Sequence, residues 1–108
     1  MIVKNKIIAH RGASMYAPEN SASSLKLASS MGVEWIETDV QITIDNKLVI
    51  FHDEKLNRTS NGEGFLALKK FSELKKLDIG SWFSKEFADE KILSLAEFLD
   101  LIKSYKFS

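Results

Sequence analysis

The sequence contains no cysteine, a single proline and only five glycines among its 108 residues. The absence of cysteine excludes disulfide bonds and thiolate metal sites, so any metal ion must be bound by oxygen or imidazole ligands. The segment Met1–Ala9 is too short, and too often interrupted by lysine, to act as a signal peptide. Because a chain without cysteine also suits a reducing compartment, we expect a cytoplasmic protein.

The chain also lacks an excess of either charge, with 15 basic and 15 acidic residues. No basic stripe is present, which argues against nucleic acid as a partner. No apolar run approaches the roughly 20 residues that a membrane span requires. An apolar content of 44% in a chain of this length is typical of one globular unit.

Arginine and histidine are scarce, because the sequence has only two of each and all its other basic residues are lysines. All four residues fall in motif-like stretches: His10, Arg11, His52 and Arg58. A guanidinium group binds phosphate through a planar fork that an ammonium group does not have. Retained arginine therefore indicates recognition of an anion such as phosphate, although two cases also allow chance.

The N-terminal third predicts a strand, a loop and a helix. Lys6–Ala9 is an apolar run that ends at His10 and Arg11, as a buried strand does before a loop. Capping residues at 18–21 precede a helix that ends at Gly32. One apolar face of this helix is made by Ala22, Leu25, Ala28 and Met31.

Two further strands are expected over Trp35–Thr43, which alternates with a period of two, and Leu48–His52. The connection between them is too short for a parallel crossover, so they should form an antiparallel hairpin. A two-residue turn at Asp45 and Asn46 would place His52 directly opposite Asp39.

After the hairpin the pattern becomes irregular until a helix over Ser94–Tyr105, which carries a capping box of Ser94 and Glu97. We predict an insertion that, with the hairpin, covers about residues 44–92. Its aromatic residues are expected to form a small core: Phe65, Trp82, Phe83 and Phe87. The next strand of a β/α protein would begin at Phe107–Ser108.

Glu37 and Asp39 lie on the same side of the predicted strand, about 7 Å apart at their Cα atoms. Two carboxylates at this spacing can share a hard cation, Mg²⁺ or Ca²⁺, and leave coordination positions for substrate oxygens. The alternative is an ordinary acidic face exposed to solvent.

His10 and His52 each end a predicted strand, where two histidines could serve as general acid and general base. Arg11, beside His10, is a candidate phosphate ligand. The alternatives are structural histidines and a surface ion pair for Arg11. Glu19 is either a residue lining the site or a carboxylate favoured by the dipole of the following helix.

Taken together, these motifs follow one another in an order that resembles the glycerophosphodiester phosphodiesterase family. The resemblance covers essentially the whole chain and is strongest from Ile7 to Gly64. The residues that carry it are His10-Arg11-Gly12-Ala13-Ser14, Pro18-Glu19-Asn20-Ser21, Glu37-Thr38-Asp39-Val40-Gln41, Thr43-x-Asp45, Val49-Ile50-Phe51-His52-Asp53, and Leu56-Asn57-Arg58-Thr59 with Gly62-x-Gly64.

The resemblance implies an α/β fold, the N-terminal portion of a (β/α)₈ TIM barrel with a small insertion after strand two. It implies a metal-dependent hydrolase that cleaves small-molecule glycerophosphodiesters to glycerol 3-phosphate and an alcohol. It also implies roles for individual residues: His10 and His52 as the acid/base pair, Arg11 on the phosphate, Glu37 and Asp39 on Mg²⁺ or Ca²⁺, and Glu19 lining the site.

A barrel of this kind needs roughly 250 residues, more than twice the length of this sequence. The family's third acidic metal ligand and a phosphate-facing lysine, expected on the next strand, are not encoded in these residues. Two alternatives therefore stay open: a noncatalytic remnant or module that binds metal or phosphodiester without turnover, and half of a split enzyme whose barrel a second chain completes.

Overall fold

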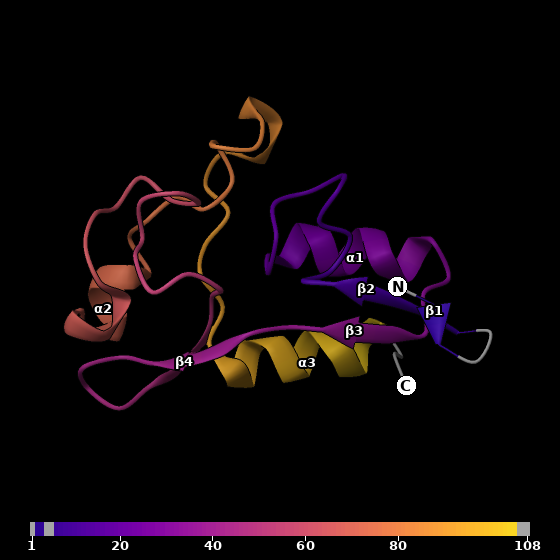
Figure 1. Ribbon diagram of the computed structural model, residues 1–108, viewed down its shortest axis with the longest axis horizontal. Helices are drawn as coiled ribbons and strands as arrows, with labels where there is room; N and C mark the ends of the chain where they lie inside the picture. Colours follow the sequence, from indigo (N-terminus) through magenta and orange to yellow (C-terminus); the bar gives the residue numbers. More distant parts are fainter. Residues whose placement is uncertain (1, 4–5, 106–108) are drawn as a thin grey trace.

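The computed structural model describes residues 2–3 and 6–105 and shows an α/β arrangement (Figure 1). The strands are β1 (Ile2–Val3), β2 (Lys6–His10), β3 (Trp35–Glu37), β4 (Val40–Ile42) and β5 (Leu48–Ile50). The helices are α1 (Ala22–Ser30), α2 (Phe71–Leu74) and α3 (Leu95–Tyr105), with short 3₁₀ turns η1 (Leu66–Leu68) and η2 (Lys85–Phe87). The strand expected at Phe107–Ser108 lies outside the described residues. None of the helices in the described ranges is long and apolar enough to cross a bilayer.

The N-terminal unit is a β-α-β motif in which β2 and β3 are parallel and α1 connects them. β1 pairs with β2 on its other side, in antiparallel orientation, so that the sheet order is β1-β2-β3. In the β2–β3 register His10 lies opposite Glu37, and each is the last residue of its strand. A predicted acid/base residue and a predicted metal ligand therefore start from the same edge of the sheet.

Helix α1 has the boundaries that its capping residues predict. The Ser21 hydroxyl accepts a hydrogen bond from the Ser24 amide at 3.1 Å, and the Ser24 hydroxyl in turn accepts one from the Ser21 amide at 3.2 Å. Gly32 follows the C-cap with a φ of +74°, the left-handed conformation that glycine adopts most easily. Leu25 and Ala28 lie on the buried side of the helix as predicted, but Ser24 is also buried there and Met31, predicted for the same face, is 54% exposed.

The prediction of one continuous strand over Trp35–Thr43 is wrong. β3 pairs with β2, whereas β4 pairs only with β5, and the backbone leaves the strand conformation at Thr38 and Asp39. The side chain of Asn20 hydrogen-bonds to both interrupted residues, with O···O 2.7 Å to Thr38 and N···O 3.1 Å to Asp39. The break therefore coincides with hydrogen bonds from Asn20, which precedes α1. The alternation of apolar and polar residues could not reveal these bonds.

The hairpin itself is confirmed, but its loop is one residue longer than predicted. β4 and β5 pair in the register Val40 to Ile50 and Ile42 to Leu48, and the Thr43 amide donates to the Lys47 carbonyl at 2.9 Å. Asn46 has a φ of +61°, as the last residue of a three-residue hairpin loop commonly does. Asp39 consequently lies opposite Phe51, whose amide donates to the Asp39 carbonyl at 3.0 Å, and not opposite His52.

Helices α1 and α3 lie side by side and share one core with β5. Its buried side chains are Leu25, Ile50, Leu93 and Phe98. The backbone of residues 93–94 runs along β5, where the Ile50 amide donates to the Leu93 carbonyl at 2.9 Å. The predicted capping box is present at the start of α3, because Ser94 and Glu97 each bind the other's amide. This packing fixes the sheet against both helices.

The segment between β5 and α3 has a separate core and lies to one side of the β1-β2-β3 sheet (Figure 1). That core is mainly aliphatic: Val49, Phe51, Leu56, Leu66, Leu74, Ile79 and Ile92. The expectation of an aromatic core is wrong, since Phe65 and Trp82 are 45% and 40% exposed. Phe83 contacts both Trp82 and Phe87 edge to face, with ring centroids 5.6 and 5.7 Å apart, outside this core.

Candidate active site

His10 and Glu37 stand next to each other at the carboxyl ends of β2 and β3. The Nε2 atom of His10 is 3.6 Å from Oε1 of Glu37, which is an ionic contact when His10 is protonated but is too long for a hydrogen bond. Directly after β2, the Arg11 amide donates to the Glu37 carbonyl at 2.7 Å. The parallel pairing therefore holds an imidazole, a carboxylate and the start of the Arg11 loop together.

Arg11 turns back over this edge and contacts two carboxylates. Its Nη1 donates to Oε2 of Glu19 at 3.1 Å, and its Nε lies 3.5 Å from Oδ2 of Asp39. Arg11 has a φ of +57° and Asn20 a φ of +56°, both unusual for residues with a side chain. The backbone N–H of Asn20 donates to the backbone carbonyl of Arg11 at 2.8 Å, which closes the loop in this strained form.

Asn20 is a site residue that the sequence interpretation treated only as a possible helix cap. Its side chain is 3% exposed, donates to Asp39 Oδ2 and accepts from the Thr38 hydroxyl. By binding the two residues that interrupt the predicted strand, it aims the Asp39 carboxylate towards Arg11. Its place beside Glu19 in the Pro18–Ser21 motif was the only sequence signal.

His52 is oriented by a carboxylate and an arginine from the segment after β5. Nδ1 of His52 is 2.7 Å from Oδ1 of Asp53. Arg58 grips the same carboxylate with Nε at 2.8 Å from Oδ2 and Nη2 at 2.9 Å from Oδ1. The hydrogen bonds from Arg58, followed by that from His52, hold the pKa of Asp53 far below its usual range despite partial burial. Asp53 is therefore a permanent anion beside the His52 ring.

Arg58 also binds Glu19, with Nη1 3.2 Å from Oε1 and Nη2 3.1 Å from Oε2. Because Glu19 is shared with Arg11, this contact joins the His52 side of the site to the Arg11 side. The hydrogen bonds with Asp53 and Glu19 raise the pKa of the Arg58 guanidinium above its ordinary value, so it stays charged at any physiological pH. The scarcity of arginine pointed to Arg58 in the sequence, but nothing there identified its partners.

Gln41 secures the backbone on both sides of His52. Its Nε2 donates to the carbonyl of Phe51 at 2.8 Å and to that of Asp53 at 2.7 Å. Since Gln41 belongs to β4, the hairpin itself holds the His52 segment in position.

The six residues singled out in the sequence form two ionic groups, which are joined by the hydrogen bond from the Arg11 backbone amide to the Glu37 carbonyl. One group is His10 with Glu37, and the other contains Arg11, Glu19, Asp39 and His52 together with Asn20, Asp53 and Arg58. His10 contacts Glu37, Arg11 contacts Glu19 and Asp39, and His52 joins through Asp53 and Arg58. Within the described ranges no hydrogen bond or ion pair joins His10 directly to His52. The sequence prediction of opposite strand positions for His52 and Asp39 is replaced by this chain of ionic contacts.

Two groups of carboxylates in the site differ in their capacity to hold a cation. Glu19, His52 and Asp53 offer ligand atoms within 4.8 Å of one another. Arg58, however, already binds both of these carboxylates through two hydrogen bonds each, so a cation would have to displace it. Glu37 differs, because its Oε1 is a buried atom that has no hydrogen-bond donor among the described residues. An oxygen in this state fits a metal ligand better than a surface carboxylate.

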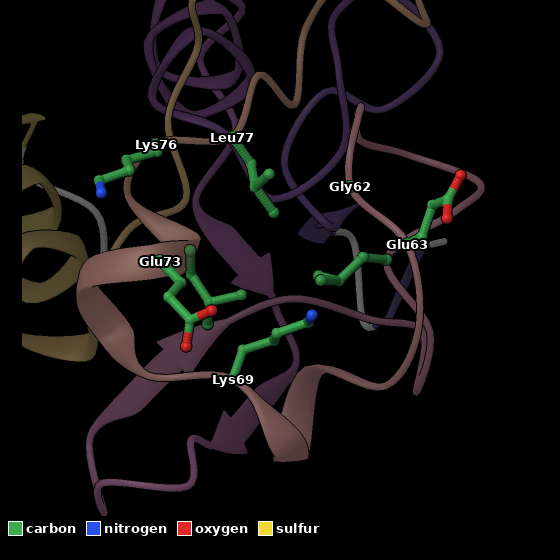
Figure 2. A pocket seen from close by; sticks show the side chains of 8 residues that line it. Gly62, Glu63, Lys69, Glu73, Lys76 and Leu77 are labelled. Atoms are coloured by element: carbon green, nitrogen blue, oxygen red, sulfur yellow. The ribbon is translucent and has the colours of Figure 1, made fainter.

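A hollow of about 330 Å³ lies elsewhere, on the segment after β5 (Figure 2). Leu77 points into it, whereas the charged ends of Glu63 and Lys76 point away from it. Its lining contains none of the site residues described above: Leu56, Gly62, Glu63, Lys69, Glu73, Leu74, Lys76 and Leu77. The network at the strand ends and this hollow are therefore separate features.

Comparison with known proteins shows to which family this chain belongs. Residues 10–108 match the model of the glycerophosphoryl diester phosphodiesterase family. The chain belongs to this family. The match begins at His10, the first residue of the network, and extends through α3. The family resemblance inferred from the motifs is thus confirmed.

Relatives and solved structures agree with this membership. A glycerophosphodiester phosphodiesterase of Caldanaerobacter subterraneus is 47% identical over 100 residues, which are 93% of this chain and 41% of the relative. A phosphodiesterase of Oleispira antarctica, solved with its product sn-glycerol-3-phosphate, superimposes with a TM-score of 0.93 at 44% identity, over 95% of this chain and 42% of that one. A glycerophosphodiester phosphodiesterase from Agrobacterium tumefaciens gives 0.89 at 38% identity, over 93% and 43%. The chain spans less than half the length of the curated relatives it matches.

Proposed function

We propose that this chain provides the N-terminal part of the active site of a metal-dependent glycerophosphodiester phosphodiesterase. In this proposal β2 and β3 are the first two strands of a (β/α)₈ barrel, and residues 44–92 form a hairpin and insertion after the second. The observation that carries it is the position of His10, Arg11 and Glu37 at the carboxyl ends of two adjacent parallel strands. Active sites of such barrels lie at this end, where the loops after the strands converge.

The proposed substrate is a small glycerophosphodiester, and Arg11 is its phosphate ligand. The Arg11 side chain is only 18% exposed, and its Nε is a buried atom without a hydrogen-bond acceptor among the described residues. A partly buried guanidinium whose Nε makes only a 3.5 Å ionic contact, with Asp39, keeps hydrogen-bonding capacity for a phosphate oxygen. The sn-glycerol-3-phosphate in the Oleispira structure supports this class of substrate, because it contains the same phosphate and glycerol groups.

His10 and His52 are proposed as the acid/base pair. Asp53 faces Nδ1 of His52, so a proton placed on Nδ1 leaves Nε2 as the atom that exchanges a proton with the substrate. His10 lies with its Nε2 3.6 Å from Oε1 of Glu37, at the edge of the sheet where the proposed metal and phosphate ligands also lie. One histidine then removes a proton from the attacking oxygen, and the other protonates the oxygen of the leaving alcohol.

Glu37 and Asp39 are the residues that would hold Mg²⁺ or Ca²⁺. The buried Oε1 of Glu37 lacks a hydrogen-bond donor among the described residues, and the Asp39 carboxylate is held in place by Asn20 through Oδ2. A hard divalent cation prefers carboxylate oxygens of this kind. When bound, it would offset the negative charge that the phosphate develops during cleavage.

A second candidate is half of a split enzyme, in which another chain provides the remaining strands and helices. The hairpin offers a docking face for it, because Val40, Ile42 and Leu48 share one face of β4 and β5 and are 47%, 50% and 45% exposed. The matched segment covers 41% and 42% of two relatives, so the other chain would have to supply the remaining length. Activity that appears on mixing this chain with the remaining barrel would support the split form. Activity confined to a covalent fusion would contradict it.

The proposed function is tested with this chain fused to the C-terminal remainder of the Caldanaerobacter relative, a fusion that we call the completed barrel. The assay is release of glycerol 3-phosphate from glycerophosphocholine with added Mg²⁺ or Ca²⁺. His10→Ala and His52→Ala should each lower the rate roughly 10²- to 10⁴-fold, about 3 to 5 kcal/mol of barrier. The control is Lys103→Gln, which removes an exposed charge on α3.

A polypeptide of only these 108 residues should hydrolyse little or no substrate, because most of a barrel is absent from it. Robust turnover by that polypeptide would contradict the proposed division of the active site. Undiminished turnover in either histidine variant of the completed barrel would overturn the catalytic assignment. An inactive completed barrel, folded by circular dichroism, would overturn the proposed function as a whole.

A further inference from the structure

Arg58 makes more side-chain hydrogen bonds within the network than a simple surface ion pair requires. It comes from the loop after β5, and Glu19, one of its two partners, is 39 residues away in the sequence. Four hydrogen bonds join its guanidinium to Asp53 and Glu19, two to each carboxylate. Bidentate geometry on both sides fixes the plane of the guanidinium and of each carboxylate.

Each of these two carboxylates also hydrogen-bonds to a residue with a proposed role in the reaction. Asp53 is bound to the His52 ring at Nδ1, and Glu19 is bound to Nη1 of Arg11. Among the described residues, the hydrogen bonds and ion pairs of the Arg58 guanidinium go to Asp53 and Glu19 and not to His52 or Arg11 themselves. Its influence on them passes through Asp53 and Glu19, and it connects the acid/base side of the site with the phosphate side.

We propose that Arg58 is a positioning residue that orients His52 and Arg11 together. This inference rests on the proposed function, since it assigns Arg58 to the same reaction. Through Asp53, Arg58 keeps the His52 ring in the tautomer with the proton on Nδ1. Through Glu19, it keeps the Arg11 guanidinium directed over the strand ends.

The alternative is that Arg58 binds the substrate phosphate directly, as a second phosphate ligand. A guanidinium has five N–H donors, and four are used by Asp53 and Glu19. One remaining donor does not allow the bidentate grip by which arginine binds phosphate. The geometry therefore favours positioning. Lysine could not replace Arg58, because an ammonium group lacks the planar fork that matches two carboxylates.

The first measurement observes the His52 ring in the completed barrel, labelled with ¹⁵N in histidine. The His52 signals are identified by their absence from His52→Ala. The unmodified protein should show neutral His52 as one tautomer, with the proton on Nδ1. Arg58→Gln and Arg58→Lys should both give a mixture of tautomers, whereas Lys103→Gln should not. A single Nδ1–H tautomer in both Arg58 variants would overturn the positioning role.

The second measurement is steady-state kinetics. Arg58→Gln should lower kcat roughly 10- to 100-fold, because misplacing a reacting group by about 1 Å costs rates of that order. Asp53→Asn interrupts the path through Asp53 from the other end, so the double variant should be little worse than Arg58→Gln alone. Independent, multiplying losses would contradict a shared path through Asp53. A raised KM with unchanged kcat would instead identify Arg58 as a direct phosphate ligand.

The two hypotheses can fail separately. If the completed barrel has no activity, the proposed function is wrong, but the tautomer of His52 still decides whether Arg58 orients that ring. If Arg58→Gln does not fold, Asp53→Asn provides the same ring measurement with Arg58 in place. A His52 ring that keeps its single tautomer in Asp53→Asn would then overturn the proposal.

Discussion

His10 and Glu37 lie opposite each other on adjacent parallel strands, with Nε2 of His10 3.6 Å from Oε1 of Glu37. The same Glu37 oxygen is the buried atom that lacks a hydrogen-bond donor. A cation bound to this oxygen would neutralise the negative charge that His10 faces. Because the Glu37 carboxylate would then contact both the metal ion and His10, metal binding and proton transfer should be coupled.

The metal prediction concerns Glu37→Gln combined with Asp39→Asn in the completed barrel. This double substitution should abolish Mg²⁺ or Ca²⁺ binding measured by isothermal titration calorimetry, because amide oxygens carry no charge to attract a hard cation. The matched control is Glu34→Gln, which neutralises an exposed carboxylate just before β3 and should leave binding unchanged. Equal binding by the double variant would place the metal elsewhere, with the cluster of Glu19, His52 and Asp53 as the first candidate.

The loop after β2 depends on Gly12, which has a φ of +79° and lies against α1. A Cβ at this position would be 2.3 Å from the Ser24 hydroxyl oxygen and 2.7 Å from the Ser24 Cβ. Gly32 has a similar φ of +74°, but nothing lies within 4 Å of its Cβ position. Gly32→Ala therefore measures backbone strain alone, and Gly12→Ala measures strain plus collision.

We expect Gly32→Ala to lower the free energy of unfolding by about 1 kcal/mol and Gly12→Ala by about 2 to 4 kcal/mol. Urea denaturation followed by circular dichroism measures both. Equal losses in the two variants would mean that α1 moves away from the loop without cost, contrary to the tight packing of Ser24.

Gln41 should affect turnover through the backbone around His52. Gln41→Leu removes both hydrogen bonds to the carbonyls of Phe51 and Asp53, and Gln41→Glu places a carboxylate against those same oxygens. We expect kcat to fall roughly tenfold in Gln41→Leu and further in Gln41→Glu, with KM nearly constant. The control is Asn57→Ala, which removes a loop hydrogen bond to the Gly64 amide without touching these carbonyls. If Gln41→Glu retains full kcat, the two hydrogen bonds do not position His52.

Stability at low pH should depend on Asp78, which closes the loop between α2 and α3. Its carboxylate accepts hydrogen bonds from the Ser81 hydroxyl and from three backbone amides, those of Gly80, Ser81 and Asp89. The Ser81 hydroxyl contributes most to a pKa well below the usual range. Because the carboxyl binds protons more weakly when folded, its contribution to stability is full above its unfolded pKa of about 4 and is lost as the pH falls further.

The difference in unfolding free energy between the unmodified chain and Asp78→Asn should therefore be largest at neutral pH and shrink below pH about 4. Urea denaturation between neutral and acidic pH measures it, with Asp100→Asn on the exposed side of α3 as the control. A difference that is constant across this range would show that the charge of Asp78 does not contribute through these hydrogen bonds.

The elements that sequence patterns predicted well are those governed by neighbours in the chain. The Ser21 cap, the Gly32 terminus and the Ser94–Glu97 capping box each involve residues a few positions apart, so their signals are complete in the sequence. The strand break at Thr38 and Asp39 was missed for the opposite reason. The hydrogen bonds that accompany it come from Asn20, 18 and 19 residues away, and the alternation of apolar residues continues through the break unchanged.

The hairpin register and the insertion core show the same limit. A three-residue loop replaced the predicted two-residue turn because Asn46 adopts the left-handed conformation, and that shift put Phe51 in the place expected for His52. In the insertion, aliphatic residues fill the core, while Trp82 stays at the rim with its indole N–H bound to the Ile79 carbonyl at 2.7 Å. Size alone did not decide which side chains were buried.

The sequence by itself determined the family, the α/β class and the caps of the helices, and it supplied the residues now proposed to react, because motif order and local spacing carry that information. Only the tertiary structure decided which of these residues meet. It placed His10 against Glu37 through parallel pairing and joined Arg11 to His52 through Glu19, Arg58 and Asp53. These contacts link positions up to 39 residues apart, and they form only when the strands, the α1 loop and the insertion pack together.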